Sequence, residues 1–304
     1  MGFIARTVGV VGPTGVGKSD LAIGLARRLG GEVVNADAYQ FYRGMDVGTA
    51  KVPSAGRGGV PHHLLDVLDL AEPASVADFQ HHARAVIADC WSREVVPVVA
   101  GGSSLYMRAV VDDLDFPGTD PAVRARWATR CEEIGPAALH AELVARDPEA
   151  AAHILPSNGR RIVRALEVVE LTGRPFRATM PPYESVIGPV ALVGLRADRE
   201  VLDARLAARV EAMWAAGFVE EVEKLAAEGL ADAPTASRAI GYAQILDFLA
   251  RRCAEDEAKA ATIRVTQQFA RRQERLFAKD PRVVWLDYDA PDLLDRAMTV
   301  VEGE

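Results

Sequence analysis

Residues 12–19 form a candidate phosphate-binding loop. They fit the P-loop pattern G-x-x-x-x-G-K-[ST] and read Gly12, Pro13, Thr14, Gly15, Val16, Gly17, Lys18 and Ser19. In this pattern the glycines let backbone N–H groups curl around phosphate oxygens, the lysine neutralises charge, and the serine hydroxyl can ligate Mg²⁺. An apolar run at 6–12 and a helical pattern at 18–29 flank the loop, as its function requires. We therefore expect all eight residues to bind phosphates, with Ser19 as a magnesium ligand.

A carboxylate after the second apolar run is the next feature that could do chemistry. Asp37 follows residues 32–36, so it should lie at the carboxyl edge of a sheet, beside the phosphate loop. There it would bind the water of a metal ion or accept a proton. The alternative is that Asp37 only caps a helix that begins near Ala38.

The phosphate loop alone is compatible with ATP and other nucleotides, but the sequence does not indicate nucleotide hydrolysis. It contains no Asn-Lys-x-Asp segment to recognise guanine. The strand-terminal aspartate of such enzymes has two rival candidates, Asp37 and Asp66. The ligand whose phosphates bind the loop is therefore left open by the loop itself.

The elements that must position these residues alternate between strand and helix. Strand-like runs at 6–12, 32–36, 64–68 and 97–100 are separated by helical patterns at 18–29 and about 76–91. This alternation predicts a parallel sheet. After residue 115 only helical segments follow, until strand-like runs return at 190–195 and 283–286. We expect an α/β fold with a P-loop core (1–115 and 190–304, with C-terminal helices) and a mostly helical insertion (116–189).

The composition of the chain indicates where the protein is found and which kinds of binding it does not perform. The chain has 304 residues, 49% of them apolar, in short runs interrupted by charge, so we expect a cytoplasmic protein without membrane association. Its net charge of −8 argues against nonspecific coating of nucleic acid. Two stretches are nevertheless basic, 156–177 and 259–282, the second with an Arg271-Arg272 pair. Three unpaired cysteines, Cys90, Cys131 and Cys253, fit reduced core thiols.

Six motifs, taken together, resemble those of the bacterial tRNA dimethylallyltransferases. In order they are GPTGVGKS, DAYQFYRGMDVGTAK, VPHHLLD, AGGSSLY, RRIVRALEV and SRAIGYAQ. The resemblance extends from about residue 8 to residue 286, and the segment beginning at Asp37 is its most specific part. It implies that the loop binds dimethylallyl diphosphate with Mg²⁺. It also implies that the prenyl group is transferred to N6 of the adenosine on the 3′ side of a tRNA anticodon, with release of pyrophosphate.

The resemblance also implies roles for individual residues. Asp37 matches the general base, and Ser103 stands in the channel where the substrates meet, at a position where the family usually carries Thr. Contacts to tRNA are implied for Asp37, Ala38, Tyr39, Gln40, Ser103, Arg124, Arg160, Arg161, Ile162, Val163, Arg164, Arg238, Ala239, Ile240, Gly241, Tyr242 and Ala243. Ser103 could instead cap the helix 104–111, and the arginines at 160–164 could form a solvated helix face.

Other functions stay open from the residues alone. A P-loop kinase for a small metabolite, a nucleotide-switched binding protein, and a relative that prenylates free AMP all share the phosphate loop. The pairs His62-His63 and His81-His82 do not predict a metal site, because adjacent side chains diverge and no third ligand has suitable spacing. We expect a monomer that binds tRNA and dimethylallyl diphosphate.

Overall fold

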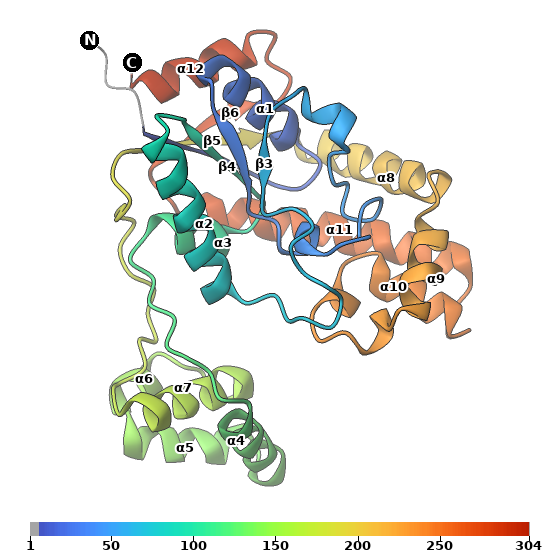
Figure 1. The fold of residues 1–304 in the computed structure, drawn as a ribbon. Coiled ribbons are helices and arrows are strands. Elements are labelled where there is room, and N and C mark those ends of the chain that lie inside the picture. Colours follow the sequence, from blue (N-terminus) through green and yellow to red (C-terminus); the bar gives the residue numbers. More distant parts are fainter. Residues whose placement is uncertain (1–5, 304) are drawn as a thin grey trace. The chain divides into compact units, whose positions relative to one another are not determined.

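A six-stranded parallel sheet forms the centre of the fold. The computed structural model describes residues 6–303 (Figure 1). Its strands are ordered β3-β2-β4-β1-β5-β6. All five neighbouring pairs are parallel. The strands are β1 Thr7–Val11, β2 Glu32–Asn35, β3 His62–His63, β4 Pro97–Ala100, β5 Val190–Arg196 and β6 Val283–Asp287. The predicted α/β fold with a parallel sheet is confirmed.

Helices cover both faces of the sheet, because its strands are apolar on both sides. Val8 and Val10 of β1 pack in one buried cluster with α1 (Lys18–Leu29), α8 (Arg199–Ala215) and α12 (Leu293–Glu302). Val11 belongs to a second cluster with α2 (Val76–Ser92) and α3 (Ser104–Val111). A third cluster, built from α9 (Phe218–Ala227) and α10 (Tyr242–Leu249), packs on the loop that follows β2. Within residues 6–303 no helix has the length and apolar character needed to cross a membrane.

The strand predicted at 64–68 is wrong. The strand in this region is only His62–His63, and the chain then turns, with φ of 60° at Leu64 and 56° at Asp66. Left-handed backbone of this kind cannot continue a strand. The turn is held by hydrogen bonds, since the Leu64 carbonyl accepts from the Asn35 side chain at 2.9 Å.

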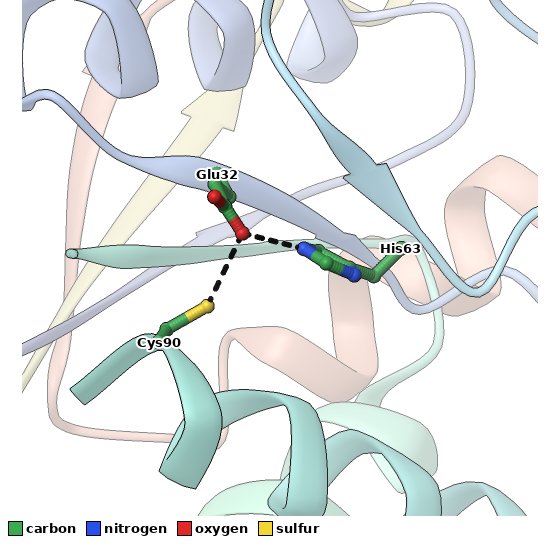
Figure 2. A group of neighbouring side chains, drawn as sticks. All are labelled: Glu32, His63 and Cys90. Atoms are coloured by element: carbon green, nitrogen blue, oxygen red, sulfur yellow. Dashed lines mark hydrogen bonds and ion pairs between the residues drawn. The ribbon is translucent and has the colours of Figure 1, made fainter. Parts of the chain in front are cut away.

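A polar cluster joins β2, β3 and α2 (Figure 2). Oε2 of Glu32 lies 2.7 Å from Nε2 of His63 and 3.6 Å from the Cys90 sulfur. Both carboxylate oxygens also accept N–H groups of Arg93, and these bonds lower the pKa of Glu32 to about 2. Burial raises the pKa of Cys90 to about 11, which keeps it a thiol. The three ligand types are close enough to hold a metal ion. The Arg93 guanidinium already supplies the positive charge, so we interpret the cluster as a structural anchor.

The helical insertion forms a compact unit of its own, Asp113–Pro182. Its helices are α4 Pro121–Ile134, α5 Pro136–Arg146, α6 Pro148–Ala152 and α7 Gly159–Thr172. Trp127, Leu139, Leu143, Ile162 and Leu166 lie in its separate apolar core. We expected the insertion to end at residue 189, but residues 183–189 belong to the other unit. There Arg108 stacks over the Tyr183 ring and the Val186 N–H donates to the Val111 carbonyl.

Candidate functional site

Three loops meet at the carboxyl edge of the sheet and enclose a cavity of about 590 Å³. They follow β1, β2 and β4, whose carboxyl ends must lie at the same edge because these strands are parallel neighbours. The lining includes Thr14, Gly15, Gly17, Lys18, Ser19, Asp37, Gln40, Gly101, Gly102, Arg205 and Arg209. The structure thus brings Asp37 and five of the eight residues of the phosphate loop to one cavity, whereas Gly12, Pro13 and Val16 do not line it.

The phosphate loop has the backbone that its glycines permit. Gly15 and Gly17 have φ of 79° and 101°, values that side chains disfavour. Gly12 has φ of 138°, and a Cβ there would lie 2.5 Å from the Leu195 carbonyl oxygen. The Lys18 ammonium donates to the Pro13 carbonyl at 2.7 Å. Burial lowers the pKa of Lys18 to about 8, although the Asp37 carboxylate opposes that shift.

Asp37 both caps a short helix and faces the cavity. Its Oδ1 accepts the Tyr39 N–H at 3.0 Å, at the start of the 3₁₀ helix η1 (Ala38–Phe41). Burial raises the pKa of Asp37, against the Tyr39 N–H and the positive charges of Lys18 and Arg209. A raised pKa brings a carboxylate nearer to the range in which it exchanges protons at working pH. The cap and a role as proton acceptor are therefore compatible.

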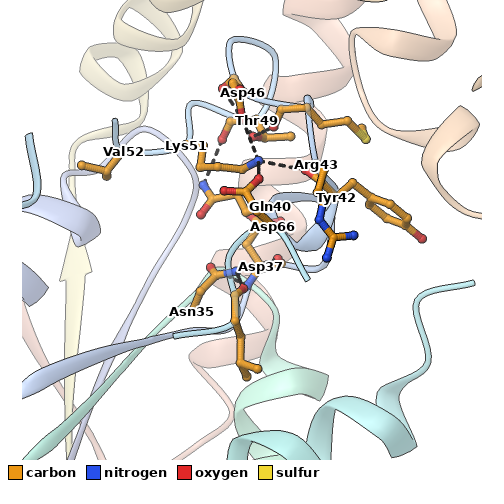
Figure 3. Close-up of polar contacts among 12 residues, drawn as sticks. Asn35, Asp37, Gln40, Tyr42, Arg43, Asp46, Thr49, Lys51, Val52 and Asp66 are labelled. Atoms are coloured by element: carbon orange, nitrogen blue, oxygen red, sulfur yellow. Dashed lines mark hydrogen bonds and ion pairs between the residues drawn. The ribbon is translucent and has the colours of Figure 1, made fainter. Parts of the chain in front are cut away.

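The loop between η1 and residue 52 is fixed by a buried lysine (Figure 3). The Lys51 ammonium, 3% exposed, donates to Asp46 at 2.7 Å, to Asp66 at 2.6 Å and to the Tyr42 carbonyl at 2.8 Å. The Gln40 amide donates to the Thr49 carbonyl at 3.0 Å, so the loop also orients Gln40. Asp66, the rival candidate for the strand-terminal carboxylate, is thus a partner of Lys51.

A carboxylate of α9 also binds the loop between η1 and residue 52. Glu221 accepts the backbone N–H groups of Asp46, Val47 and Gly48 at 3.0, 2.7 and 3.2 Å. It also accepts the Tyr242 hydroxyl at 2.5 Å. Gly48 is required here, because a Cβ would lie 2.1 Å from the Phe218 ring. The segment 46–48 is therefore fixed by groups far away in the sequence.

Two arginines of α8 complete the cavity, and the sequence reasoning missed both. Arg205 and Arg209 line it, and Arg205 donates weakly to the Gly15 carbonyl at 3.4 Å. Burial lowers the pKa of Arg209, and the Asp37 carboxylate opposes this. Their four-residue spacing on a helix that follows the returning strand was the available signal, but exposed helical arginines commonly show the same spacing.

A smaller cavity of about 90 Å³ adjoins the first, sharing Thr14, Asp37, Thr49 and Arg209 with it. Its other walls are mainly apolar and include Tyr39, Met213, Ala239, Ile240, Tyr242 and Phe269. The predicted segment 238–243 therefore reaches this site through three residues. Arg238 is exposed, whereas Ala239 and Tyr242 are buried and can touch a ligand only within the cavity.

Comparison with known proteins agrees with this geometry. Residues 40–280 match the family model described as IPP transferase, and residues 6–70 match the one described as isopentenyl transferase. The chain belongs to the IPP transferase family. A tRNA dimethylallyltransferase of Thermobifida fusca is 58% identical, covering 98% of this chain and 95% of that protein. One from Kineococcus radiotolerans is 59% identical, covering 97% and 95%.

Two solved structures are also similar to this chain in fold. The tRNA isopentenylpyrophosphate transferase of Bacillus halodurans has a TM-score of 0.71 and 36% identity, covering 98% of this chain and 97% of that one. A eukaryotic dimethylallyltransferase acting on tRNA has a TM-score of 0.79 at 24% identity, covering 96% and 76%, and supports the fold.

Ser103 of this IPP transferase family member caps α3. Its hydroxyl accepts the Tyr106 N–H at a long 3.4 Å, and Ser103 does not line either of the two cavities described above. Its neighbours Gly101 and Gly102 line the larger one. The alternative role of helix cap is therefore present in the structure, and a contact of Ser103 with substrate stays a prediction.

The predicted arginines of the insertion gather around one groove but differ in their contacts. Arg124, Arg160, Arg161, Val163 and Arg164 line a groove of about 760 Å³ within this unit. Arg124 and Arg164 both bind the fully buried carboxylate of Glu167, at 2.9 and 2.8 Å. Arg160 is exposed and makes no ion pair with any residue in the described chain. Ile162 is fully buried in the core of the insertion, and its contact with tRNA stays a prediction.

Part of the second basic stretch is neutralised within the core unit. Arg271 pairs with Asp203 at 3.0 Å, and Arg282 pairs with Asp112 and Asp280 at 2.7 and 2.6 Å. These arginines therefore join elements of the fold. Four other basic residues of 259–282 are exposed, so part of the positive charge that we inferred from the sequence remains at the surface: Arg264, Arg272, Arg275 and Lys279.

Proposed function

We propose that this protein is a tRNA dimethylallyltransferase that joins the dimethylallyl group of dimethylallyl diphosphate to N6 of the adenosine on the 3′ side of a tRNA anticodon. The observation that carries the proposal is the cavity in which the phosphate loop, Asp37 and Arg209 face one another. The relatives that match nearly the whole chain are named for this reaction.

The phosphate loop and Arg209 bind the leaving group. Backbone N–H groups of residues 15–19, the Lys18 ammonium and the Arg209 guanidinium surround the diphosphate. Their fixed positive charge stabilises the negative charge that grows as the bond from the allylic carbon to oxygen breaks. Pyrophosphate leaves with that electron pair.

Asp37 accepts the proton of the nucleophile. The exocyclic nitrogen of adenine is conjugated to the ring and attacks weakly, so loss of its proton to a carboxylate assists formation of the N–C bond. The smaller cavity receives the flipped adenine between Tyr39 and Ile240, with Asp37 at the boundary of the two cavities.

The donor atoms at the larger cavity suit Mg²⁺. The Ser19 hydroxyl and the Asp20 carboxylate are hard oxygen ligands, which this ion prefers. Ser19 would hold the ion. When bound, Mg²⁺ neutralises diphosphate charge.

The groove of the insertion binds the phosphate backbone of tRNA. Arg124, Arg160 and Arg161 are exposed at this groove, although Arg124, like Arg164, also binds Glu167. Exposed arginines neutralise phosphates and give binding that weakens with salt.

One experiment tests the function directly. Purified protein, Mg²⁺ and labelled dimethylallyl diphosphate are incubated with unmodified tRNA, and the digested nucleosides are analysed by mass spectrometry. We expect dimethylallyl adenosine and stoichiometric pyrophosphate. Incubation with AMP or with ATP and small metabolites separates the alternatives, and product there without product on tRNA would refute the proposal.

A further inference from the structure

One buried amide connects two loops of the larger cavity. Gln273 lies on α11 (Glu255–Phe277) and is 5% exposed. Its Oε1 accepts the Thr14 N–H at 2.9 Å, and its Nε2 donates to the Gly102 carbonyl at 2.8 Å. Because one partner is a donor and the other an acceptor, only one orientation of the amide satisfies both. Gln273 therefore joins the phosphate loop to the loop that follows β4.

The fit around this amide is close. A Cβ at position 102 would lie 2.2 Å from Nε2 of Gln273, so only glycine leaves room for the bond. Thr14 stands within the phosphate loop, and Gly102 directly precedes Ser103. Gln273 thus adds a link between two walls of the cavity that the pairing of β1 with β4 and the bond from the Gly101 N–H to the Val10 carbonyl already bring together.

The same helix also fixes the third wall. Arg271 pairs with Asp203 of α8 at 3.0 Å, and the Gln267 amide donates to the Asp203 carbonyl at 3.1 Å. Asp203 lies on the helix that carries Arg205 and Arg209 into the cavity. Side chains of α11 therefore contact the phosphate loop, the loop that follows β4 and the helix that carries Arg205 and Arg209.

We propose that Gln273 is a positioning residue for prenyl transfer, which fixes the phosphate loop, and with it the bound diphosphate, relative to the loop that follows β4. The inference rests on the proposed function. Transfer needs the nucleophile in line with the breaking bond, and a displacement of about 1 Å can cost roughly 10²-fold in rate. Removing the amide should therefore lower the rate of transfer and weaken diphosphate binding, while the separate tRNA groove is unaffected.

The test compares Gln273→Met with Gln80→Met. Methionine keeps the length and apolar stem of glutamine but makes neither bond. Gln80 is a matched control, since its amide donates to the Ala109 carbonyl at 2.9 Å and it does not line the larger cavity. We expect single-turnover transfer to fall roughly 10- to 100-fold in Gln273→Met and to stay near wild type in Gln80→Met. Affinity for tRNA should stay within about twofold in both, because neither change removes a phosphate contact.

Gln273→Glu separates positioning from stability. Glutamate still accepts the Thr14 N–H but presents a second acceptor to the Gly102 carbonyl, so transfer should be slower even if the melting temperature equals that of wild type. Titration with inorganic pyrophosphate supplies a readout that does not need transfer, and binding should be weaker in both variants at position 273. Rates and pyrophosphate affinities equal to those of Gln80→Met would overturn the proposal. Failure of wild type to prenylate tRNA, with weakened pyrophosphate binding in the variants, would instead refute the proposed function alone.

Discussion

Asp37 allows its two roles to be separated by one substitution. Asparagine can cap η1 as aspartate does, because its side-chain oxygen also accepts the Tyr39 N–H. It cannot accept a proton at working pH. We predict that Asp37→Asn keeps the melting temperature and lowers single-turnover prenyl transfer about 10²- to 10⁴-fold. The effect should appear in kcat, with modest changes in KM.

The control for this prediction is Asp66→Asn, which alters a carboxylate bound to Lys51 and outside the lining of the two cavities. Its rate should exceed that of Asp37→Asn by at least tenfold. If Asp37→Asn transferred the prenyl group at a rate near that of wild type, the Asp37 carboxylate would act only as the cap of η1.

The pKa values of Lys18 and Asp37 predict a bell-shaped pH dependence of kcat/KM for the donor. Burial lowers the pKa of Lys18 to about 8, so the free enzyme loses this positive charge as the pH rises through 8, and diphosphate binding weakens. Burial raises the pKa of Asp37, so its base form is lost on acidification at a higher pH than for an ordinary aspartate. Steady-state rates across the pH range measure both limbs.

Lys18→Arg tests the alkaline limb, because a guanidinium keeps its charge throughout this range. The limb should move to higher pH in the variant, even if the rate at neutral pH is lower. An unchanged alkaline limb would show that another group titrates there.

At the scale of elements, α7 carries two kinds of arginine. Arg160 and Arg161 are exposed at the groove, whereas Arg164 helps to neutralise the buried carboxylate of Glu167. We predict that Arg160→Gln with Arg161→Gln lowers tRNA affinity and reduces the slope of log K against log salt by roughly 0.7–0.9 for each lost phosphate contact. The melting temperature should change little.

Arg164→Gln, on the same helix, is the variant with which the double variant of Arg160 and Arg161 is compared. It removes a partner of a buried charge, so the melting temperature should fall clearly, since uncompensated buried charge is costly. Equal salt slopes in wild type and the double variant would make Arg160 and Arg161 a solvated face.

The loop 46–48 depends on α9 in a way that can be measured by hydrogen exchange. Glu221 accepts three backbone N–H groups and the Tyr242 hydroxyl, and glutamine has only one acceptor oxygen. We predict faster amide exchange at Asp46, Val47 and Gly48 in Glu221→Gln. Exchange in β1 should be unchanged and serves as the internal control. Protection equal to wild type at 46–48 would mean that Lys51 alone fixes the loop.

Sequence reasoning found the parts of the site that lie close together in the chain. Lys18 and Asp37 each follow a strand, so the geometry of a parallel sheet places them at one edge. Arg209 and Gln273 gave no comparable signal, because their roles arise only when α8 and α11 pack beside the phosphate loop. The strand predicted at 64–68 failed for a related reason, since an apolar pattern does not reveal the left-handed turn at Leu64.

At the scale of the whole molecule, the insertion is expected to be an independent folding unit. Asp113–Pro182 has its own apolar core and its own buried ion pairs to Glu167. We predict that the isolated fragment 113–182 is helical by circular dichroism and melts cooperatively. Trp127→Ala should abolish the transition, because Trp127 is 6% exposed within that core. A fragment with a random-coil spectrum would show that the insertion needs the rest of the chain.

The position of β1 between β4 and β5 has a consequence for synthesis on the ribosome. β5 begins at Val190, after the whole of α4–α7 has been translated. One edge of β1, whose five residues are all buried in the finished sheet, must therefore stay unpaired while the insertion emerges from the exit tunnel. The nascent chain thus presents an apolar strand edge to solvent for that interval, and this edge is where a chaperone would bind.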